Sequence, residues 1–311
     1  MKIIIPIAGK GTRLRPHTYS KPKPFMPIAG KQVIDFILET LLPLNPEEII
    51  IVHDRYTEVA VKRVLAEYFP NLNFKFAMQY LPLGTGHAIY QVKAHIKEGD
   101  EIIIAYCDMI IGTDITRINT LRNTCDGILF SIEVKDPENY GVVVHDNFIA
   151  TKIVEKPKDA PSNMANMGLF YFKDGFNFIN TYVQKVMDKG KNVKGEYYLT
   201  DAFTYMIEDN KRLLVEKIDY VLDTGTVDKL IEANKFLLQG SVAKSDNVVI
   251  ENSEIGENVS ISSNTVIRDC KISNSIIGSN TVLEGMDIKD SLIGSNVRMK
   301  KEGKKLNIGD G

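Results

Sequence analysis

Short apolar runs alternate with amphipathic stretches along the first half of the chain. Apolar runs of this length are typical of strands covered on both faces of a parallel sheet. They lie at residues 2–7, 48–53, 74–79, 101–107 and 127–134, with amphipathic stretches at 57–68 and 88–96. The alternation predicts right-handed βαβ units and an α/β fold with a doubly wound, mostly parallel, Rossmann-like sheet. Ligands in such sheets bind beyond the carboxyl ends of the strands.

The alternation of apolar runs and amphipathic stretches becomes less regular after Asp136. Shorter strands are expected at 141–144, 148–154 and 168–172, and helical stretches at 176–187 and 199–208. We interpret this region as an insertion that completes one side of a ligand-binding cleft. A last strong helix is predicted at 226–238, where Gln239-Gly240 provides a stop signal. Residues 1–240 therefore form the first predicted domain.

A different period begins at Ser241. Apolar residues recur every five or six positions, which matches neither a helix nor an ordinary hairpin. They are Ile250, Ile255, Ile261, Ile267, Ile272, Ile277, Leu283, Ile288 and Ile293. This period resembles the hexapeptide repeat, in which each side of a triangular coil contributes one inward side chain. Residues 241–311 are thus predicted to form a short left-handed parallel β-helix of about three coils.

Composition restricts the partners and the compartment. The chain of 311 residues has 38 Lys and Arg against 40 Asp and Glu, a formal charge of −2. This balance argues against nucleic acid or a membrane surface as a partner. Three cysteines, at positions 107, 125 and 270, form neither a CxxC pair nor an even framework. We therefore expect a soluble protein of a reducing compartment, the cytoplasm by default.

A glycine-containing segment, AGKGTRLRP at residues 8–16, follows the first predicted strand directly. Gly9 and Gly11 allow the main chain to approach phosphates closely, and the backbone N–H groups can converge on an anion. The Walker pattern is absent, and Leu14 replaces the third glycine of the dinucleotide pattern. Arg13 and, ten residues on, the proline-flanked Lys23 supply positive charge. A guanidinium suits bidentate contact with the β- and γ-phosphates, and an ammonium suits the reacting α-phosphate.

The GxGTRL motif with its downstream proline-lysine pair, Pro22-Lys23, closely resembles the signature of the sugar-1-phosphate nucleotidylyltransferase (NDP-sugar pyrophosphorylase) family. The resemblance covers residues 1 to about 238, and hexapeptide tails occur in several branches of the family. It implies catalytic roles for Arg13 and Lys23. It also implies nucleotide contacts from two segments, namely Ala8, Gly9, Gly11 and Thr12 in the first, and Gln79, Gly84 and Thr85 in the second.

The second of these segments, QYLPLGTGHA at residues 79–88, follows a predicted strand. The amide of Gln79 can pair with the donor and acceptor edges of a pyrimidine, and Gly84 allows the backbone to meet the base. Its sequence looks most like that of the glucose-1-phosphate uridylyl- and thymidylyltransferases. UTP or dTTP is therefore the favoured nucleotide.

Two aspartates in the order of the family imply a magnesium site. Asp108 follows the strand predicted at 101–107, and Asp223 precedes the last helix of the first domain. Carboxylate oxygens together with phosphate oxygens are the ligands that Mg²⁺ prefers. Cys107 and Met109 depart from the family pattern beside Asp108, and so do Val221 and Leu222 before Asp223.

The resemblance also implies a sugar-phosphate subsite. Its predicted members are Gly141, Glu155, Lys156 and Asn166. Glu155 would accept sugar hydroxyls and Lys156 would contact the phosphate. Thr200 and Asp201 are expected only to cap a helix.

These residues predict nucleotidyl transfer to a sugar-1-phosphate, with glucose-1-phosphate favoured. No Ser-His-Asp or Cys-His nucleophile is apparent, and none is needed because a phosphate monoester is largely ionised at pH 7. Direct in-line attack would release pyrophosphate. Catalysis would depend on positioning and on charge neutralisation by Mg²⁺, Arg13 and Lys23.

Three other interpretations stay open at this stage. In the first, the acceptor is an N-acetylated amino-sugar phosphate instead of glucose-1-phosphate. In the second, the chain is a non-catalytic subunit that binds sugar nucleotide. In the third, the coils act as an acyltransferase. No histidine follows His145, so we favour an oligomerisation or capping role for the coils and expect a homo-oligomer.

Overall fold

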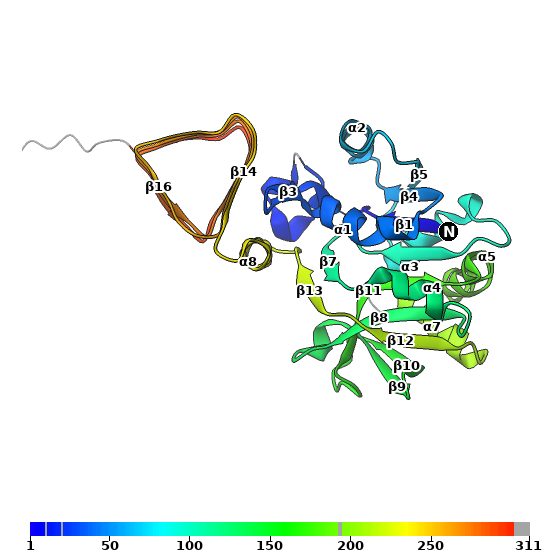
Figure 1. The fold of residues 1–311 in the computed structure, drawn as a ribbon. Helices are drawn as coiled ribbons and strands as arrows, with labels where there is room; N and C mark the ends of the chain where they lie inside the picture. The colour runs from blue at the N-terminus through cyan, green and yellow to red at the C-terminus, as the bar shows by residue number, and fades with distance from the viewer. Residues whose placement is uncertain (10, 20, 192–194, 302–311) are drawn as a thin grey trace, which may run out of the picture. The chain divides into compact units, whose positions relative to one another are not determined.

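The computed structural model describes residues 1–9, 11–19, 21–191 and 195–301 (Figure 1). Lys10 and Ser20 lie outside these ranges; both belong to the segment from Gly9 to Lys23 that is predicted to bind phosphate, called the predicted phosphate loop below. The chain divides into two compact units. The first comprises Met1–Pro24 and Ile34–Leu222, and the second comprises Phe25–Val33 and the chain from Asp223 onward. The predicted boundary at 240/241 falls inside the second unit, between helix α8 (Val227–Leu238) and strand β14 (Val242–Lys244).

A mixed sheet organises the first unit. Across the described residues it has nine strands in the order β5-β4-β1-β6-β11-β8-β12-β10-β9. Their bounds are Phe74–Met78, Glu48–His53, Lys2–Pro6, Ile102–Ala105, Met164–Phe172, Gly127–Glu133, Leu213–Lys217, Ile149–Glu155 and Gly141–Asp146 in that order. Neighbours from β5 to β6 pair in parallel, and so do β8 and β12. The α/β fold is confirmed.

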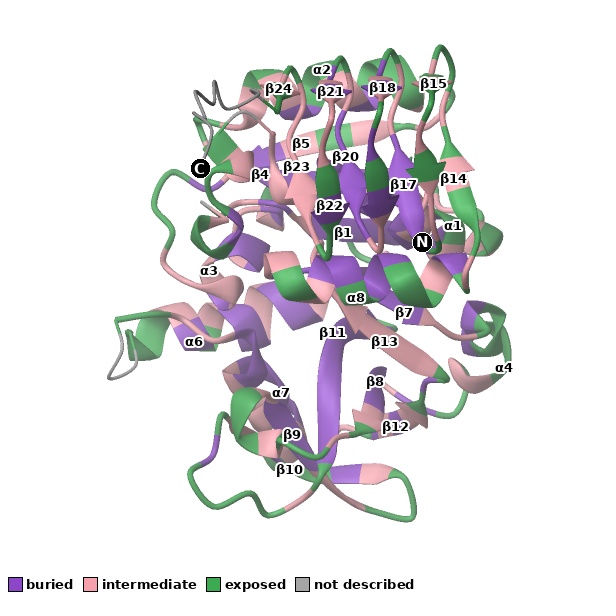
Figure 2. Cartoon of the chain, turned by 90° about the vertical axis from the view of Figure 1, so that its left-hand side faces the viewer, coloured by how far each residue is buried: buried purple, intermediate pink, exposed green. Residues whose placement is uncertain are grey.

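Strand β11 is the main departure from a purely parallel sheet. It lies between β6 and β8 and runs antiparallel to both. All of its residues are buried (Figure 2). The region after Asp136 is therefore an integral part of the sheet, because β9, β10 and β11 are all members of it.

The helices of the first unit follow the predicted pattern with different ends. They are α1 (Val33–Leu41), α2 (Glu58–Tyr68), α3 (Thr85–Tyr90), α4 (Ile118–Leu121), α5 (Gly175–Asn177), α6 (Gln184–Lys189) and α7 (Leu199–Glu208). The helix expected at 88–96 begins at Thr85 and ends at Tyr90, where a short 3₁₀ segment takes over at Lys93–His95. The stretch expected at 176–187 contains a π-helical turn, Phe178–Val183. No helix among the described residues is long and apolar enough to cross a membrane.

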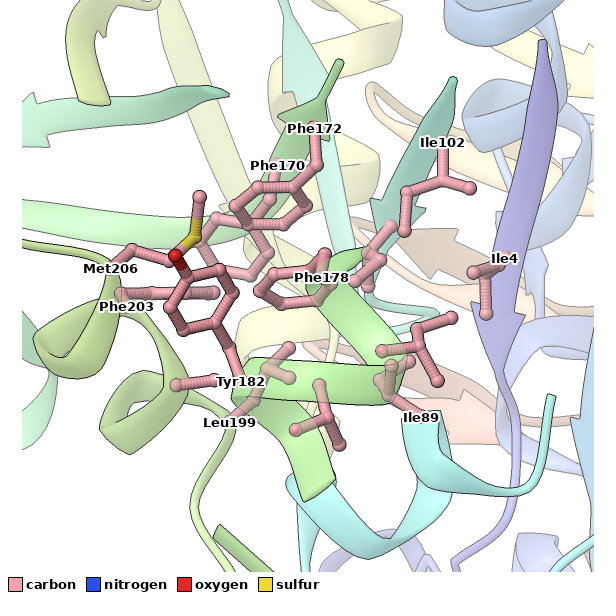
Figure 3. Packing of buried hydrophobic residues seen from close by; sticks show 14 of the residues in the cluster. Ile4, Ile89, Ile102, Phe170, Phe172, Phe178, Tyr182, Leu199, Phe203 and Met206 are labelled. Atoms are coloured by element: carbon pink, nitrogen blue, oxygen red, sulfur yellow. The ribbon is translucent and has the colours of Figure 1, made fainter. Parts of the chain in front are cut away.

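An aromatic core joins the sheet to these helices (Figure 3). Phe172 of β11 stacks on Phe178, with ring centroids 3.7 Å apart and an interplanar angle of 8°. Phe203 of α7 packs against Phe170, with centroids 4.8 Å apart. Leu199, the first residue of α7, is fully buried in the same cluster. Burial of these rings fixes α7 and β11 to each other, at about 25 cal/mol for each Å² of apolar surface.

The second unit contains a triangular parallel β-helix, as the hexapeptide period predicts (Figure 1). Its three sides are the sheets β14-β17-β20-β23, β15-β18-β21-β24 and β16-β19-β22. After β14 the strands span Val249–Glu251, Glu254–Ile255, Val259–Ile261, Val266–Arg268, Lys271–Ser273, Ile276–Ile277, Val282–Glu284, Asp287–Lys289, Leu292–Ile293 and Arg298–Lys300. Inward residues stack in register, as Ile250 on Ile267 and Ile267 on Leu283 show.

Asparagine, which is abundant in this segment, occupies the corners of the triangle. Ten corner residues have φ values between 44° and 66°: Asn247, Asn252, Asn258, Asn264, Asp269, Asn274, Asn280, Gly285, Asp290 and Asn296. Asn, Asp and Gly tolerate this left-handed region best. Corner side chains also bond along the stack, because Asn247 Nδ2 donates to Asn264 Oδ1 at 3.1 Å.

Asn234 of α8 connects the coils to a short hairpin formed by β2 (Pro27–Ile28) and β3 (Lys31–Gln32). This side chain is fully buried. Its Oδ1 accepts from Ala29 N–H at 2.9 Å and from Ser260 Oγ at 2.6 Å. Its Nδ2 donates to the carbonyl of Asn258 at 2.9 Å. A buried amide that is bonded through both its oxygen and its nitrogen in this way specifies one arrangement of the second unit.

Replacing a corner asparagine tests the conformational argument. We expect Asn264→Ala to lower the free energy of unfolding by about 1 kcal/mol more than Asn264→Gly, because both variants lose the amide but only alanine is strained at φ 57°. Thermal unfolding followed by circular dichroism measures both variants. An alanine variant as stable as the glycine variant would contradict the role of the corner.

Candidate active site

The predicted phosphate loop leaves the carboxyl end of β1 and is anchored at both ends. The N–H groups of Ile7 and Ala8 both donate to the carbonyl of Val52 on the neighbouring strand β4. A 3₁₀ turn at Thr12–Leu14 follows, and its Leu14 side chain is fully buried. Gly11 precedes this turn with φ 53°, and its carbonyl accepts from Thr18 Oγ1 at 2.8 Å. The fold therefore accounts for Gly11 and Leu14.

Gly9 has no such structural reason to be glycine. It is exposed, it is not among the described residues with positive φ, and a Cβ atom added to it would meet no atom of the described residues within 4 Å. An approaching ligand is a physical reason for a missing side chain at such a position.

Lys23 and Asp108 form the central ion pair of the site. Lys23 Nζ donates to Asp108 Oδ2 at 2.5 Å, and the side chains are only 13% and 25% exposed. Asp108 follows β6, whose residue Ile104 pairs in parallel with Ile4 of β1. The two loops meet because they leave the same edge of adjacent parallel strands. The structure thus brings together the predicted catalytic lysine and a predicted metal ligand.

The other basic side chains of the loop differ in their surroundings. Arg13 and Thr12 are exposed. The guanidinium of Arg15 lies 4.9 Å from the centre of the Tyr19 ring, a cation–π contact. Burial lowers the pKa of Lys21 below its ordinary value. Arg13 is therefore placed in solvent, where an anionic ligand can reach it.

The buried side chain of Gln79 stabilises the turn in the second predicted nucleotide segment. Its side chain is only 2% exposed, and Nε2 donates to the carbonyl of Gly84 at 3.1 Å. The same nitrogen lies 3.0 Å from His87 Nδ1, and burial is the main cause that lowers the pKa of His87. Gly84 has φ 102°, and a Cβ on it would lie 2.6 Å from the carbonyl oxygen of Tyr197. The fold itself therefore requires glycine at position 84.

The start of α7 clamps this segment. Gly86 N–H donates to the carbonyl of Tyr197 at 2.9 Å, and Tyr197 N–H donates to Leu83 at 2.8 Å. Leu199 N–H donates to Thr85 Oγ1 at 3.1 Å. Thr85 thus satisfies an N–H group at the first turn of α7, where no side chain of the helix itself acts as a cap.

Three of the four predicted sugar-phosphate residues converge. Asn166 Nδ2 donates to the carbonyl of Gly141 at 2.7 Å. A Cβ on Gly141 would lie 2.3 Å from Asn166 Nδ2 and 2.8 Å from Glu155 Oε2. Lys156 directly follows Glu155, but it is exposed and has φ 47°. The structure therefore assembles Gly141, Glu155 and Asn166 and leaves Lys156 at the surface.

Tyr106 and Thr200 are neighbours of the site that sequence reasoning did not select. Burial is the main cause that raises the pKa of the Tyr106 phenol far above its ordinary value, and the carboxylates of Glu155 and Asp108 add to the shift. The ring occupies the space where Gly168 lacks a Cβ, 2.4 Å away. Adjacent Cys107 has its thiol pKa raised to about 12, chiefly by burial. Position beside Asp108 is the only signal by which the sequence could have indicated Tyr106.

Asp223 ends strand β13 (Tyr220–Asp223) and belongs to the second unit. Its Oδ1 accepts from Gly225 N–H at 2.6 Å, and its Oδ2 accepts from Lys229 Nζ at 2.7 Å. The cap of α8 is Thr226, whose Oγ1 accepts from Lys229 N–H at 3.4 Å. Asp223 is therefore not the helix cap, and its carboxylate instead bonds to the turn that precedes α8 and to Lys229.

The donor set suits a cation that takes most of its ligands from its substrate. Among the described residues no group of three or more His, Cys, Asp and Glu side chains could hold a metal. Mg²⁺ is commonly bound through one or two carboxylates, with phosphates and water as the other ligands. Asp108, part-exposed and facing a lysine that also suits phosphate, fits that pattern.

A family model described as nucleotidyl transferase matches residues 2–240. Among curated proteins, the bifunctional protein GlmU of Methanococcus maripaludis is 33% identical over 274 residues, covering 86% of this chain and 62% of that protein. The GlmU of Methanocaldococcus jannaschii is also 33% identical, over 86% of this chain and 60% of its own length. A bifunctional sugar-1-phosphate nucleotidylyltransferase/acetyltransferase of Sulfurisphaera tokodaii is 31% identical, covering 86% and 62%. The chain thus spans about three fifths of these relatives.

Two solved structures share the fold. A protein described as a glucose-1-phosphate thymidylyltransferase from Bacillus anthracis superimposes with a TM-score of 0.67 at 23% identity, covering 76% of this chain and 95% of its own. A UDP-glucose pyrophosphorylase complexed with UDP-glucose gives a TM-score of 0.64 at 24% identity, covering 75% and 96%. At these identities the likeness concerns the fold alone.

The contrast between Gly9 and Gly84 yields a prediction. Gly9→Ala is expected to keep the melting temperature or raise it slightly, because alanine fits the open space and restricts the unfolded chain. Gly84→Ala is expected to cost about 2 kcal/mol or more, since the new Cβ meets backbone at a strained φ. Differential scanning calorimetry of both variants checks this. Equal melting temperatures for the two would show that the assignment of Gly84 to the fold is wrong.

Proposed function

The chain belongs to the nucleotidyl transferase family, and from that premise we propose that it transfers a nucleotidyl group to a sugar-1-phosphate. The proposed donor is a pyrimidine nucleoside triphosphate, UTP or dTTP, and the favoured acceptor is glucose-1-phosphate. The products are a nucleoside diphosphate sugar and pyrophosphate.

One observation supports this reaction above the others. The Lys23–Asp108 pair lies where the loops of β1 and β6 meet, so a basic phosphate-binding group and a carboxylate of metal-binding type share one place. Transfer between phosphates needs this combination, because the protein's main task is to neutralise charge and to align the reacting groups.

The proposed chemistry is a direct in-line displacement. An oxygen of the sugar-1-phosphate forms a bond to the α-phosphorus of the nucleotide, and the bond from that phosphorus to the pyrophosphate oxygen breaks. Lys23 would stabilise the charge that develops on the α-phosphoryl oxygens. The solvent-exposed Arg13 would contact the β- and γ-phosphates. No protein nucleophile is required, because the acceptor phosphate is already ionised.

Magnesium is the proposed cofactor. Asp108 would hold it, and Asp223 stays the predicted second carboxylate. When bound, the cation would supply positive charge to the phosphate oxygens as the bond to pyrophosphate breaks.

The proposed sugar and base are supported by the chemistry of two groups of residues. Gly141, Glu155 and Asn166 supply a carboxylate and an amide, which suit sugar hydroxyls. The turn from Gln79 to Gly84 would place backbone groups beside the base. The name of the Sulfurisphaera relative, a sugar-1-phosphate nucleotidylyltransferase/acetyltransferase, supports a sugar-phosphate acceptor.

A substrate panel tests this proposal. Coupled pyrophosphate release is measured with glucose-1-phosphate and N-acetylglucosamine-1-phosphate, each with five nucleoside triphosphates. Turnover should be highest with UTP or dTTP and glucose-1-phosphate. Arg13→Ala and Asp108→Asn should each lower kcat/KM by about 100-fold or more, since the first removes a positive charge beside the phosphates and the second weakens the binding of Mg²⁺.

Preference for N-acetylglucosamine-1-phosphate would change the acceptor and keep the reaction. Binding of nucleotide sugar without any pyrophosphate release would show a non-catalytic binding protein. Full activity of either variant would show that the assigned mechanism is wrong.

The ion pair predicts how the apo protein binds metal. Lys23→Met should raise the affinity for Mn²⁺ in the absence of nucleotide by about tenfold, because Asp108 loses a competing positive charge. The same variant should bind nucleoside triphosphate more weakly. Electron paramagnetic resonance of unbound Mn²⁺ measures the first effect, and isothermal calorimetry measures the second.

Lys62→Met is the matched control, since it removes an exposed lysine that pairs with Glu58 on α2. It should leave both affinities unchanged. Unchanged Mn²⁺ affinity in Lys23→Met would contradict competition at Asp108.

A further inference from the structure

We propose that Thr200 is a positioning residue for Glu155, holding that carboxylate in its sugar-binding orientation. The inference rests on the proposed function, because it assigns Glu155 to the acceptor sugar. It concerns a residue that sequence reasoning expected only to cap a helix.

Thr200 lies in the first turn of α7 and is buried. Its Oγ1 donates to Glu155 Oε2 at 3.1 Å. The position is not the cap of α7, which is Tyr198. The hydroxyl therefore serves a partner on another element, the end of strand β10.

The surroundings of Oε2 restrict the carboxylate further. The space above Gly141, where a Cβ would stand, is lined by Glu155 Oε2 at 2.8 Å, Asn166 Nδ2 at 2.3 Å and Thr200 Cγ2 at 3.4 Å. A threonine at this point can both donate to the carboxylate and pack with its methyl group against the glycine. A carboxylate held in one rotamer before the sugar arrives loses less conformational freedom on binding.

The backbone that carries Thr200 is itself rigid. Leu199, next to it, is fully buried in the aromatic core (Figure 3) and donates its N–H to Thr85 Oγ1. Tyr197, two residues before Leu199, accepts a hydrogen bond from Gly86 N–H through its carbonyl. The segment from Tyr197 to the first turn of α7 therefore contacts the nucleotide segment through its backbone and the sugar subsite through the Thr200 side chain. We infer that this turn fixes the two subsites relative to each other.

Three variants test the role. Thr200→Val keeps the shape and removes the hydroxyl, whereas Thr200→Ser restores the donor. We expect Thr200→Val to raise KM for the sugar-1-phosphate by about tenfold, with kcat and KM for the nucleotide changed less than threefold, because loss of one hydrogen bond to a charged group is of this order. Thr200→Ser should recover most of the loss. Thr120→Val, which removes an exposed hydroxyl bonded only within α4 and the turn before it, should behave as wild type.

A second measurement does not depend on turnover. In crystal structures of the substrate-free variants, Glu155 should adopt a different or divided rotamer in Thr200→Val and keep a single one in Thr200→Ser. An unchanged Glu155 rotamer in Thr200→Val would overturn the proposal, and so would an unchanged KM in an active enzyme. Failure of the wild type to use any sugar phosphate would overturn the proposed function instead, and the rotamer comparison would still decide the role of Thr200.

Discussion

Parallel pairing of β1 with β6 is the constraint on which the candidate site depends. The two strands are buried and apolar, so the hydrophobic effect fixes them at the centre of the sheet. Their carboxyl ends must then lie side by side, and the loops that follow carry Lys23 and Asp108. An ion pair at 2.5 Å between residues 85 positions apart is the result. The charged site is thus a consequence of where isoleucines are buried, and no local sequence preference could have produced it alone.

Much of the first unit could be predicted from the period of its apolar residues. Strand β4 and helix α7 have the expected bounds, and Leu14 replacing a glycine distinguished the phosphate loop from dinucleotide folds. The antiparallel course of β11 could not be predicted, because a strand buried on both faces has the same composition in either direction. The period of the isoleucines predicted the coils, while the left-handed corners explain the asparagines that the period alone left unexplained.

Within the site, the sequence indicated residues whose chemistry is unusual for their position. It did not indicate residues whose role is to hold another side chain of the site in place. Asp108 after a strand and Arg13 in a glycine loop attract notice by themselves. Thr200 looks like an ordinary helix-start residue until its partner, Glu155, is known. Gln79 differs in the opposite way, because its side chain suggests a ligand contact in the sequence but has a structural partner in the fold. Its amide suggests base recognition, yet in the structure the Nε2 group organises the Gly84 turn. A hydrogen bond between distant segments is specified by the fold, so it cannot be read from spacing.

The coils of the second unit also differ in length in an informative way. Val249 stacks on Val266 seventeen residues later, whereas Val266 stacks on Val282 after sixteen. The extra residue falls between Ile255 and the corner at Asn258, because Ile272 and Asn274 are one position closer together. The next corner restores the alignment of inward side chains. Each left-handed corner therefore restores the register between successive coils. As a result, a small insertion within one side does not shift the isoleucines that follow it. Such a domain can tolerate changes of length during evolution that would displace a whole face of an ordinary sheet.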